Sequence, residues 1–96
     1  MTIPDWPAIL ILGRDTCEDT IRARAHLVAR GIPFRYRNVE VDAEADTMNR
    51  SYNDGVRVTP VILIGNPDRP ARVVIEPSND ELDGAIAAAI EAVPPG

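Results

Sequence analysis

The sequence predicts an α/β domain in which a mixed four-stranded sheet carries helices on both faces. Residues 8–12 are continuously apolar, the pattern of a strand that is covered on both sides. A helical segment and a second strand pattern follow, and this order implies a parallel pair joined by a right-handed crossover. Two further strand patterns around a turn-rich segment then precede a last helix, so an antiparallel hairpin completes the sheet.

The expected elements follow one another as strand, helix, strand, helix, strand, strand, helix. Strands are expected over residues 8–12, 34–41, 57–65 and 71–75, with residues 66–70 as the connection of the hairpin. The third of these strands contains Pro60, which lacks an N–H group and is therefore expected at the start of the strand or at an edge.

Capping signals set the starts of the helices. Thr16 and Asp19 resemble a capping box, which starts the first helix at Cys17, and Gly31 is expected to end it. Asp42 is expected to cap a polar helix that runs to about Asn53. In the last helix, which Ser78 and Glu81 would cap, one apolar face is expected from Leu82, Ile86, Ala89, Ile90 and Val93. In the first helix, that face is expected from Ile21, Ala25 and Val28.

Length and composition narrow the class of protein. Ninety-six residues fit one domain over 1–96, with its core at about 7–93 and loose tails at 1–5 and 94–96. The ten basic residues are all arginine, and fifteen acidic residues give a formal net charge of −5, which argues against nucleic acid or an anionic membrane as a partner. No signal peptide or membrane span is evident, so we expect a soluble, cytoplasmic protein that is a monomer rather than an oligomer.

The chain has one cysteine, Cys17, and one histidine, His26. An intrachain disulfide is therefore impossible, and a zinc site of cysteine and histidine ligands would lack ligands. Cys17 is expected at the first turn of a helix, where unpaired amides and the helix dipole favour a thiolate and lower the thiol pKa. The alternative is a buried, inert cysteine.

Neighbouring side chains would shift the pKa of the Cys17 thiol in opposite directions. The carboxylates of Asp15, Glu18 and Asp19 would oppose a thiolate, and Arg14 would favour it. Thr20 lies one turn after Cys17, where its hydroxyl could donate a hydrogen bond to the thiolate or bond its own backbone instead. His26 is about 13 Å further along the helix, so it is not expected to be the base for Cys17.

Several motifs together resemble the glutaredoxin family of the thioredoxin fold, over roughly residues 7 to 93. Thr16-Cys17-Glu18-Asp19-Thr20 stands at the place of the active-site motif of that family, and Val58-Thr59-Pro60 matches its cis-proline element. The segment 77–82 aligns with the start of the last helix, and its Pro77-Ser78 pair is similar to mycoredoxins, which work with mycothiol. The second cysteine of the dithiol members and the Cys-Gly-Phe-Ser signature of the iron–sulfur members are both absent.

The resemblance implies a thiol–disulfide oxidoreductase that works by a monothiol mechanism. Cys17 would be the attacking thiolate, and Thr20 is the other residue of the catalytic motif. The resemblance implies a cis Pro60, backbone contacts of Thr59 with a small thiol, and binding of the charged end of that thiol by Asp80. The full set of substrate-binding candidates is Arg14, Thr16, Val58, Thr59, Pro60, Asn79 and Asp80. Arg50 and Arg57 could reach a ligand carboxylate or could simply be solvated.

The expected partners are a small thiol, glutathione or mycothiol as co-substrate, and proteins that carry disulfides. No metal and no bound redox cofactor are expected. Two alternatives remain open on the sequence: a redox-inactive binding module that keeps the fold, and a dimer that binds an iron–sulfur cluster through one Cys17 from each subunit.

Overall fold

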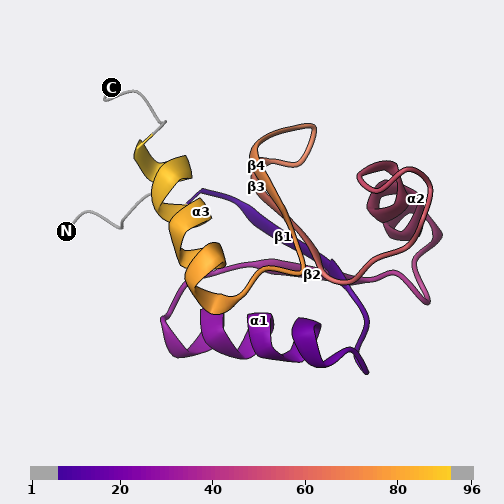
Figure 1. Cartoon of the computed structure of the whole chain (residues 1–96), viewed down its shortest axis with the longest axis horizontal. Helices are drawn as coiled ribbons and strands as arrows, with labels where there is room; N and C mark the ends of the chain where they lie inside the picture. The colour runs from indigo at the N-terminus through magenta and orange to yellow at the C-terminus, as the bar shows by residue number, and fades with distance from the viewer. Residues whose placement is uncertain (1–6, 92–96) are drawn as a thin grey trace.

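The computed structural model describes residues 7–91, and the predicted order of elements is confirmed (Figure 1). The expected loose tails, and Val93 at the end of the last helix, lie outside these residues. The strands are β1 (Ile9–Gly13), β2 (Arg35–Asn38), β3 (Val61–Asn66) and β4 (Arg69–Ile75). The helices are α1 (Glu18–Ala29), α2 (Ala43–Ser51) and α3 (Asn79–Glu91).

The four strands form one mixed sheet in the order β2-β1-β3-β4. β1 pairs parallel with β2 and antiparallel with β3, and β4 completes an antiparallel hairpin with β3. Every residue of β1 is buried, as are Val61 to Ile64 of β3, because these two strands are central and helices cover both faces.

Two apolar layers hold the helices on opposite faces of the sheet. On one face, α1 and α3 pack on the sheet through Leu27 and Ile86 among others, and on the other face α2 packs through Ala45 and the half-buried Met48. Figure 1 shows the same division, with α1 and α3 away from α2 across the strands. The predicted arrangement of helices on both faces is confirmed.

The strand boundaries required correction. The expected strand 57–65 begins only at Val61, because Pro60 has no N–H to donate to a ladder. The expected strand 34–41 is shorter, since residues 39–41 turn towards α2. β4 starts at Arg69, so the hairpin connection has two residues rather than five, and the register shifts between Ile64 and Gly65.

The start and the buried face of α1 were also predicted incorrectly. Cys17 itself is the N-cap residue, and no side chain makes a capping hydrogen bond there, so the box of Thr16 and Asp19 does not form. The buried residues of α1 are Thr20, Ala23 and Leu27, whereas two members of the predicted apolar face, Ile21 and Val28, are 50% and 69% exposed. Gly31 follows the helix with φ 69°, as expected of a glycine stop.

The caps of the other two helices are as predicted. The Asp42 side chain accepts a hydrogen bond from the Ala45 amide at 3.1 Å and caps α2. At α3, the Ser78 amide donates to Glu81 and the Glu81 amide donates to the Ser78 hydroxyl, which is a complete capping box. Leu82, Ile86 and Ala89 of α3 are buried as expected, and Ile90 is 41% exposed.

Between residues 7 and 91, no helix is both long enough and apolar enough to cross a membrane.

Gly13 and Gly84 provide a matched pair of substitutions. A Cβ added at Gly13 would lie 2.6 Å from the fully buried Thr20 side chain, whereas a Cβ at Gly84 of α3 would meet nothing within 4 Å. We expect Gly13→Ala to lower the free energy of unfolding by about 1–3 kcal/mol through overpacking. Gly84→Ala should raise it by roughly 0.5–1 kcal/mol, since alanine favours a helix.

Equilibrium unfolding in urea, followed by circular dichroism, measures both changes. If both variants shifted the unfolding free energy in the same direction, the close packing of Gly13 against Thr20 would not be a determinant of the fold.

Candidate functional site

The candidate site forms where β1 ends and β3 begins. The antiparallel register pairs Leu12 with Val61, so the residues after β1 lie beside the residues before β3. Cys17 and Thr59 are thereby brought together, although they are far apart in the sequence. The half-buried Cys17 thiol donates a hydrogen bond from Sγ to the Thr59 carbonyl oxygen at 3.5 Å.

The loop that faces the thiol is fixed at both ends. Thr59 and Pro60 are buried, and the peptide bond between them is cis. The Pro60 carbonyl accepts a hydrogen bond from the Glu76 amide at 2.9 Å, which ties the loop to the end of β4. The cis proline that the resemblance implied is therefore present beside the cysteine.

Opposing effects act on the pKa of the Cys17 thiol. Burial raises the pKa, but hydrogen bonds from the side chain of Thr59, the backbone and side chain of Thr20 and the backbone of Asp19 lower it. The net result is a pKa below the ordinary value of a cysteine. The contact with the Thr59 carbonyl belongs to the protonated thiol, whereas the amides and hydroxyls can donate to the thiolate.

Two of the three carboxylates expected to oppose a thiolate are paired with other groups. Asp19 forms an ion pair with Arg22 at 2.8 Å. Asp15 accepts a hydrogen bond from the Tyr36 hydroxyl at 2.6 Å and lies 3.7 Å from Arg24. Burial, together with the Asp15 carboxylate, raises the pKa of Tyr36 to about 12.

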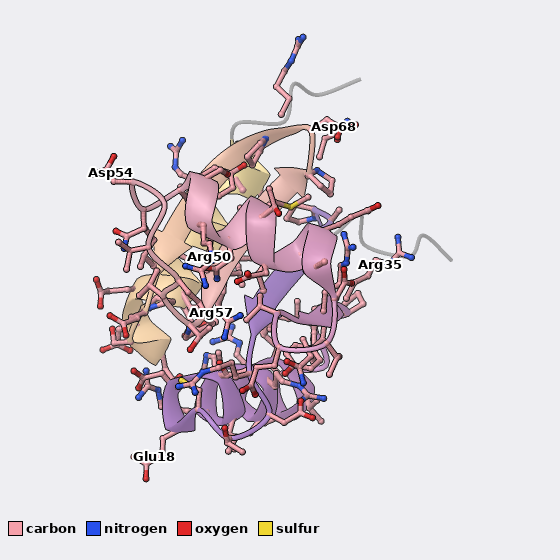
Figure 2. The ribbon with its side chains drawn as sticks, turned by 90° about the vertical axis from the view of Figure 1, so that its right-hand side faces the viewer. Glu18, Arg35, Arg50, Asp54, Arg57 and Asp68 are labelled. Carbon is pink, nitrogen blue, oxygen red and sulfur yellow. The ribbon has the colours of Figure 1, made fainter. Side chains whose placement is uncertain are left out.

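The third carboxylate, Glu18, is exposed. Figure 2 shows its side chain extending away from the body of the molecule.

Arg14 and Thr20 join the loop to the first turn of α1. The Arg14 guanidinium donates from Nε to the Thr59 hydroxyl at 3.4 Å, and the Arg14 amide donates to the Thr20 hydroxyl at 3.4 Å. Thr20 is fully buried, so its hydroxyl acts on the thiol from inside the protein and is not available to an incoming substrate.

The other substrate-binding candidates are distributed around this centre. Asn79 and Asp80 line an open hollow of about 420 Å³ at the start of α3, together with Arg22, Glu76, Ser78 and Glu81. Arg22 donates to Asp19 and to the Pro77 carbonyl, at 2.8 and 2.9 Å. Thr16 is exposed in the turn before Cys17, and Val58 is half-buried.

Sequence reasoning missed Asn49, whose fully buried carboxamide holds the backbone of Val58. The sequence carries no local signal for it, because α2 is polar at most positions and only the folded structure shows which polar side chain is buried. The remaining candidates lie in ion pairs. His26 contacts Asp83 at 2.8 Å, between α1 and α3, and does not contact Cys17.

Arg50 and Arg57 both donate to Asp46, at 3.0 and 2.8 Å. These hydrogen bonds, the one from Arg57 first, lower the pKa of the Asp46 carboxyl. Figure 2 shows both arginine side chains turned towards the molecule, whereas Asp54 points outward.

A larger hollow lies away from this chemistry. Its volume is about 790 Å³, and residues 7–10 at the start of β1 and residues 33–37 around β2 line most of it. Cys17 follows the opposite end of β1. The smaller hollow beside α3 is linked to the surroundings of the thiol by two of its lining residues, since Arg22 pairs with Asp19 and the Glu76 amide bonds the Pro60 carbonyl. No group of three or more His, Cys, Asp or Glu side chains within residues 7–91 is arranged to hold a metal ion.

The glutaredoxin family model matches residues 9–67, which include Cys17 and the Thr59–Pro60 pair. No curated protein and no solved structure matches the chain. The mixed four-stranded sheet with three helices is the α/β arrangement of a thioredoxin-like fold. Since the match spans more than half of the chain, this protein belongs to the glutaredoxin family.

Proposed function

We propose that the protein catalyses thiol–disulfide exchange by a monothiol mechanism, with Cys17 as its nucleophile. The observation that carries the proposal is the environment of that thiol. Cys17 is half-exposed at the N-cap of α1, lies beside a cis Thr59–Pro60 bond, and has a lowered pKa. A thiolate in such a position attacks disulfides faster than a thiol with an ordinary pKa does at neutral pH.

The cycle needs one protein thiol and two molecules of a small thiol. The Cys17 thiolate attacks the small-thiol sulfur of a mixed disulfide, a new S–S bond forms to Cys17, and the thiolate of the substrate protein leaves. A second small thiol, as its thiolate, then attacks the sulfur of the first. This step releases the small-molecule disulfide and restores the Cys17 thiolate. Each step breaks one S–S bond and forms another, and the second small thiol is the reductant, so the cycle needs no metal or bound redox cofactor.

The surrounding residues would serve these steps in separate ways. The Cys17 thiolate, which attacks in the first step and leaves in the second, would be stabilised by hydrogen bonds. The donors are the amides of Asp19 and Thr20 and the hydroxyls of Thr20 and Thr59. The backbone of Thr59 would align the cysteinyl part of the small thiol. Asn79 and Asp80 would bind its remainder in the hollow next to α3.

The charges that line the hollow beside α3 favour an uncharged small thiol over an anionic one. Three carboxylates, from Glu76, Asp80 and Glu81, line the hollow beside the single arginine Arg22, which already pairs with Asp19. Glutathione carries two carboxylates, whereas the cysteinyl group of mycothiol carries a neutral sugar and inositol. We therefore propose mycothiol as the preferred co-substrate and a cytoplasmic, disulfide-bearing protein as its partner.

The pH dependence of Cys17 alkylation tests the nucleophile. Because the folded protein lowers the thiol pKa, the iodoacetamide rate should reach half of its maximum at a lower pH in the native protein than in urea. At neutral pH the native protein should therefore hold more thiolate than the unfolded chain. Cys17→Ser is the blank, since the chain has no other cysteine. A native midpoint equal to or above the unfolded one would favour a redox-inactive binding module.

Turnover with two mixed disulfides tests the choice of small thiol. We expect kcat/KM to be higher for a mycothiol mixed disulfide than for the glutathione mixed disulfide of the same protein. Asp46→Asn removes the carboxylate that pairs with Arg50 and Arg57. Arg57 lies two residues before Thr59, on the segment that faces the thiol, and Arg50 shares its partner Asp46. We propose that these two arginines, once freed, would bind a carboxylate of glutathione aligned on Thr59. We therefore expect Asp46→Asn to raise kcat/KM for the glutathione substrate several-fold and to leave the mycothiol substrate unchanged, since only glutathione carries carboxylates.

Asp42→Asn is the matched control, because it removes one carboxylate of α2 that pairs with a different arginine, Arg37, and asparagine still caps a helix. Equal effects of the two variants would show that net charge alone determines the preference, and the role assigned to Arg50 and Arg57 would be wrong.

A further inference from the structure

Asn49 of α2 is a buried polar residue at the centre of a hydrogen-bond network. Its side chain is 0% exposed, and the carboxamide makes three hydrogen bonds. Nδ2 donates to the Val58 carbonyl at 2.6 Å and to the Leu12 carbonyl at 3.3 Å. Oδ1 accepts from the Val58 amide at 3.0 Å. Both polar atoms of one side chain are therefore used on the main chain of two separate segments.

Each of those segments leads directly to one half of the site. Leu12 is the second-to-last residue of β1, and the turn that follows the strand carries Arg14 and Cys17. Val58 immediately precedes Thr59, whose carbonyl contacts the Cys17 thiol. Asn49 thus connects the segment that carries the nucleophile with the segment that carries its hydrogen-bond partner.

We propose that Asn49 is a positioning residue, whose carboxamide sets the distance and orientation of Thr59 relative to Cys17. The consequence for turnover rests on the proposed function, whereas the coupling between Asn49 and the thiol does not. Val58 lies three residues before the first residue of β3, outside the ladders of that strand, so the sheet does not hold its N–H and C=O groups. The Asn49 side chain takes the place of that ladder.

Few other side chains could make this set of bonds. An amide offers two N–H donors for the two carbonyls and one oxygen for the Val58 amide. Leucine, of similar size, would leave the Val58 groups without these partners in the interior. Aspartate would bring a carboxylate against the carbonyl oxygens of Leu12 and Val58.

The test compares Asn49→Leu with wild type by the native alkylation midpoint of Cys17, which requires no turnover. We expect Asn49→Leu to raise that midpoint towards the unfolded value and to slow alkylation at neutral pH several-fold, because Thr59 no longer holds its place at the thiol. Ile86→Ala is the control for stability, since it weakens the core on the opposite face of the sheet. This control should leave the midpoint unchanged at a similar loss of unfolding free energy.

A double-mutant cycle with Thr59→Val shows whether Asn49 affects the Cys17 midpoint through Thr59 or by another route. If Asn49 acts through Thr59, adding Asn49→Leu to Thr59→Val should change the midpoint by clearly less than it does in wild type. Asn49→Ser, which retains one donor and one acceptor, should give an intermediate shift and serves if the leucine variant does not fold. An unchanged midpoint in a folded Asn49 variant, or full additivity with Thr59→Val, would overturn the proposal.

The outcomes also separate this proposal from the proposed function. A wild-type protein that fails to turn over either mixed disulfide, but shows the coupled midpoints, would contradict the oxidoreductase and support the positioning role. Turnover that survives in Asn49→Leu, together with an unchanged midpoint, would support the oxidoreductase and contradict the positioning role of Asn49.

Discussion

The antiparallel pairing of β1 with β3 is the constraint on which the rest of the structure depends. These strands are the two central ones of the sheet, and their apolar side chains form the middle of both core layers. Burial of such side chains is the main favourable contribution to folding. The register that this burial selects pairs Leu12 with Val61 and so brings Cys17 to Thr59. Core packing and site geometry therefore have the same origin.

Arginine pairing determines the electrostatic character of the site. Asp19 is paired with Arg22, Asp15 lies near Arg24, and Asp46 holds both Arg50 and Arg57. The guanidinium group, with its planar fork of donors, suits such contacts better than an ammonium group does. Pairing removes much of the acidic influence that the sequence around Cys17 suggests. It also removes arginines that would otherwise be available to an anionic ligand.

The sequence was informative where a signal is local. The capping box of Ser78 and Glu81, the Asp42 cap and the apolar run of β1 each depend on neighbouring residues, and all three were predicted. The sequence was misleading where contacts between distant segments decide which side chains are buried. Thr20 is buried because Gly13 leaves room beside it, and the apolar Ile21 is exposed instead. Nothing local indicates that a side chain of α2 supports the backbone before Pro60, so Asn49 could be recognised only from the folded structure.

The buried threonine at position 20 determines how long a mixed disulfide on Cys17 would last. In a dithiol enzyme the second cysteine, one turn along the helix, resolves a mixed disulfide at a high effective concentration. Here that position holds a threonine packed beneath Gly13, and the chain has no other thiol. Under the proposed chemistry, the Cys17 adduct would last until a free small thiol arrives, so its lifetime would be inversely proportional to the size of the reduced pool. The rate at which the modified protein returns to the free thiolate would then depend on the concentration of reduced small thiol around it.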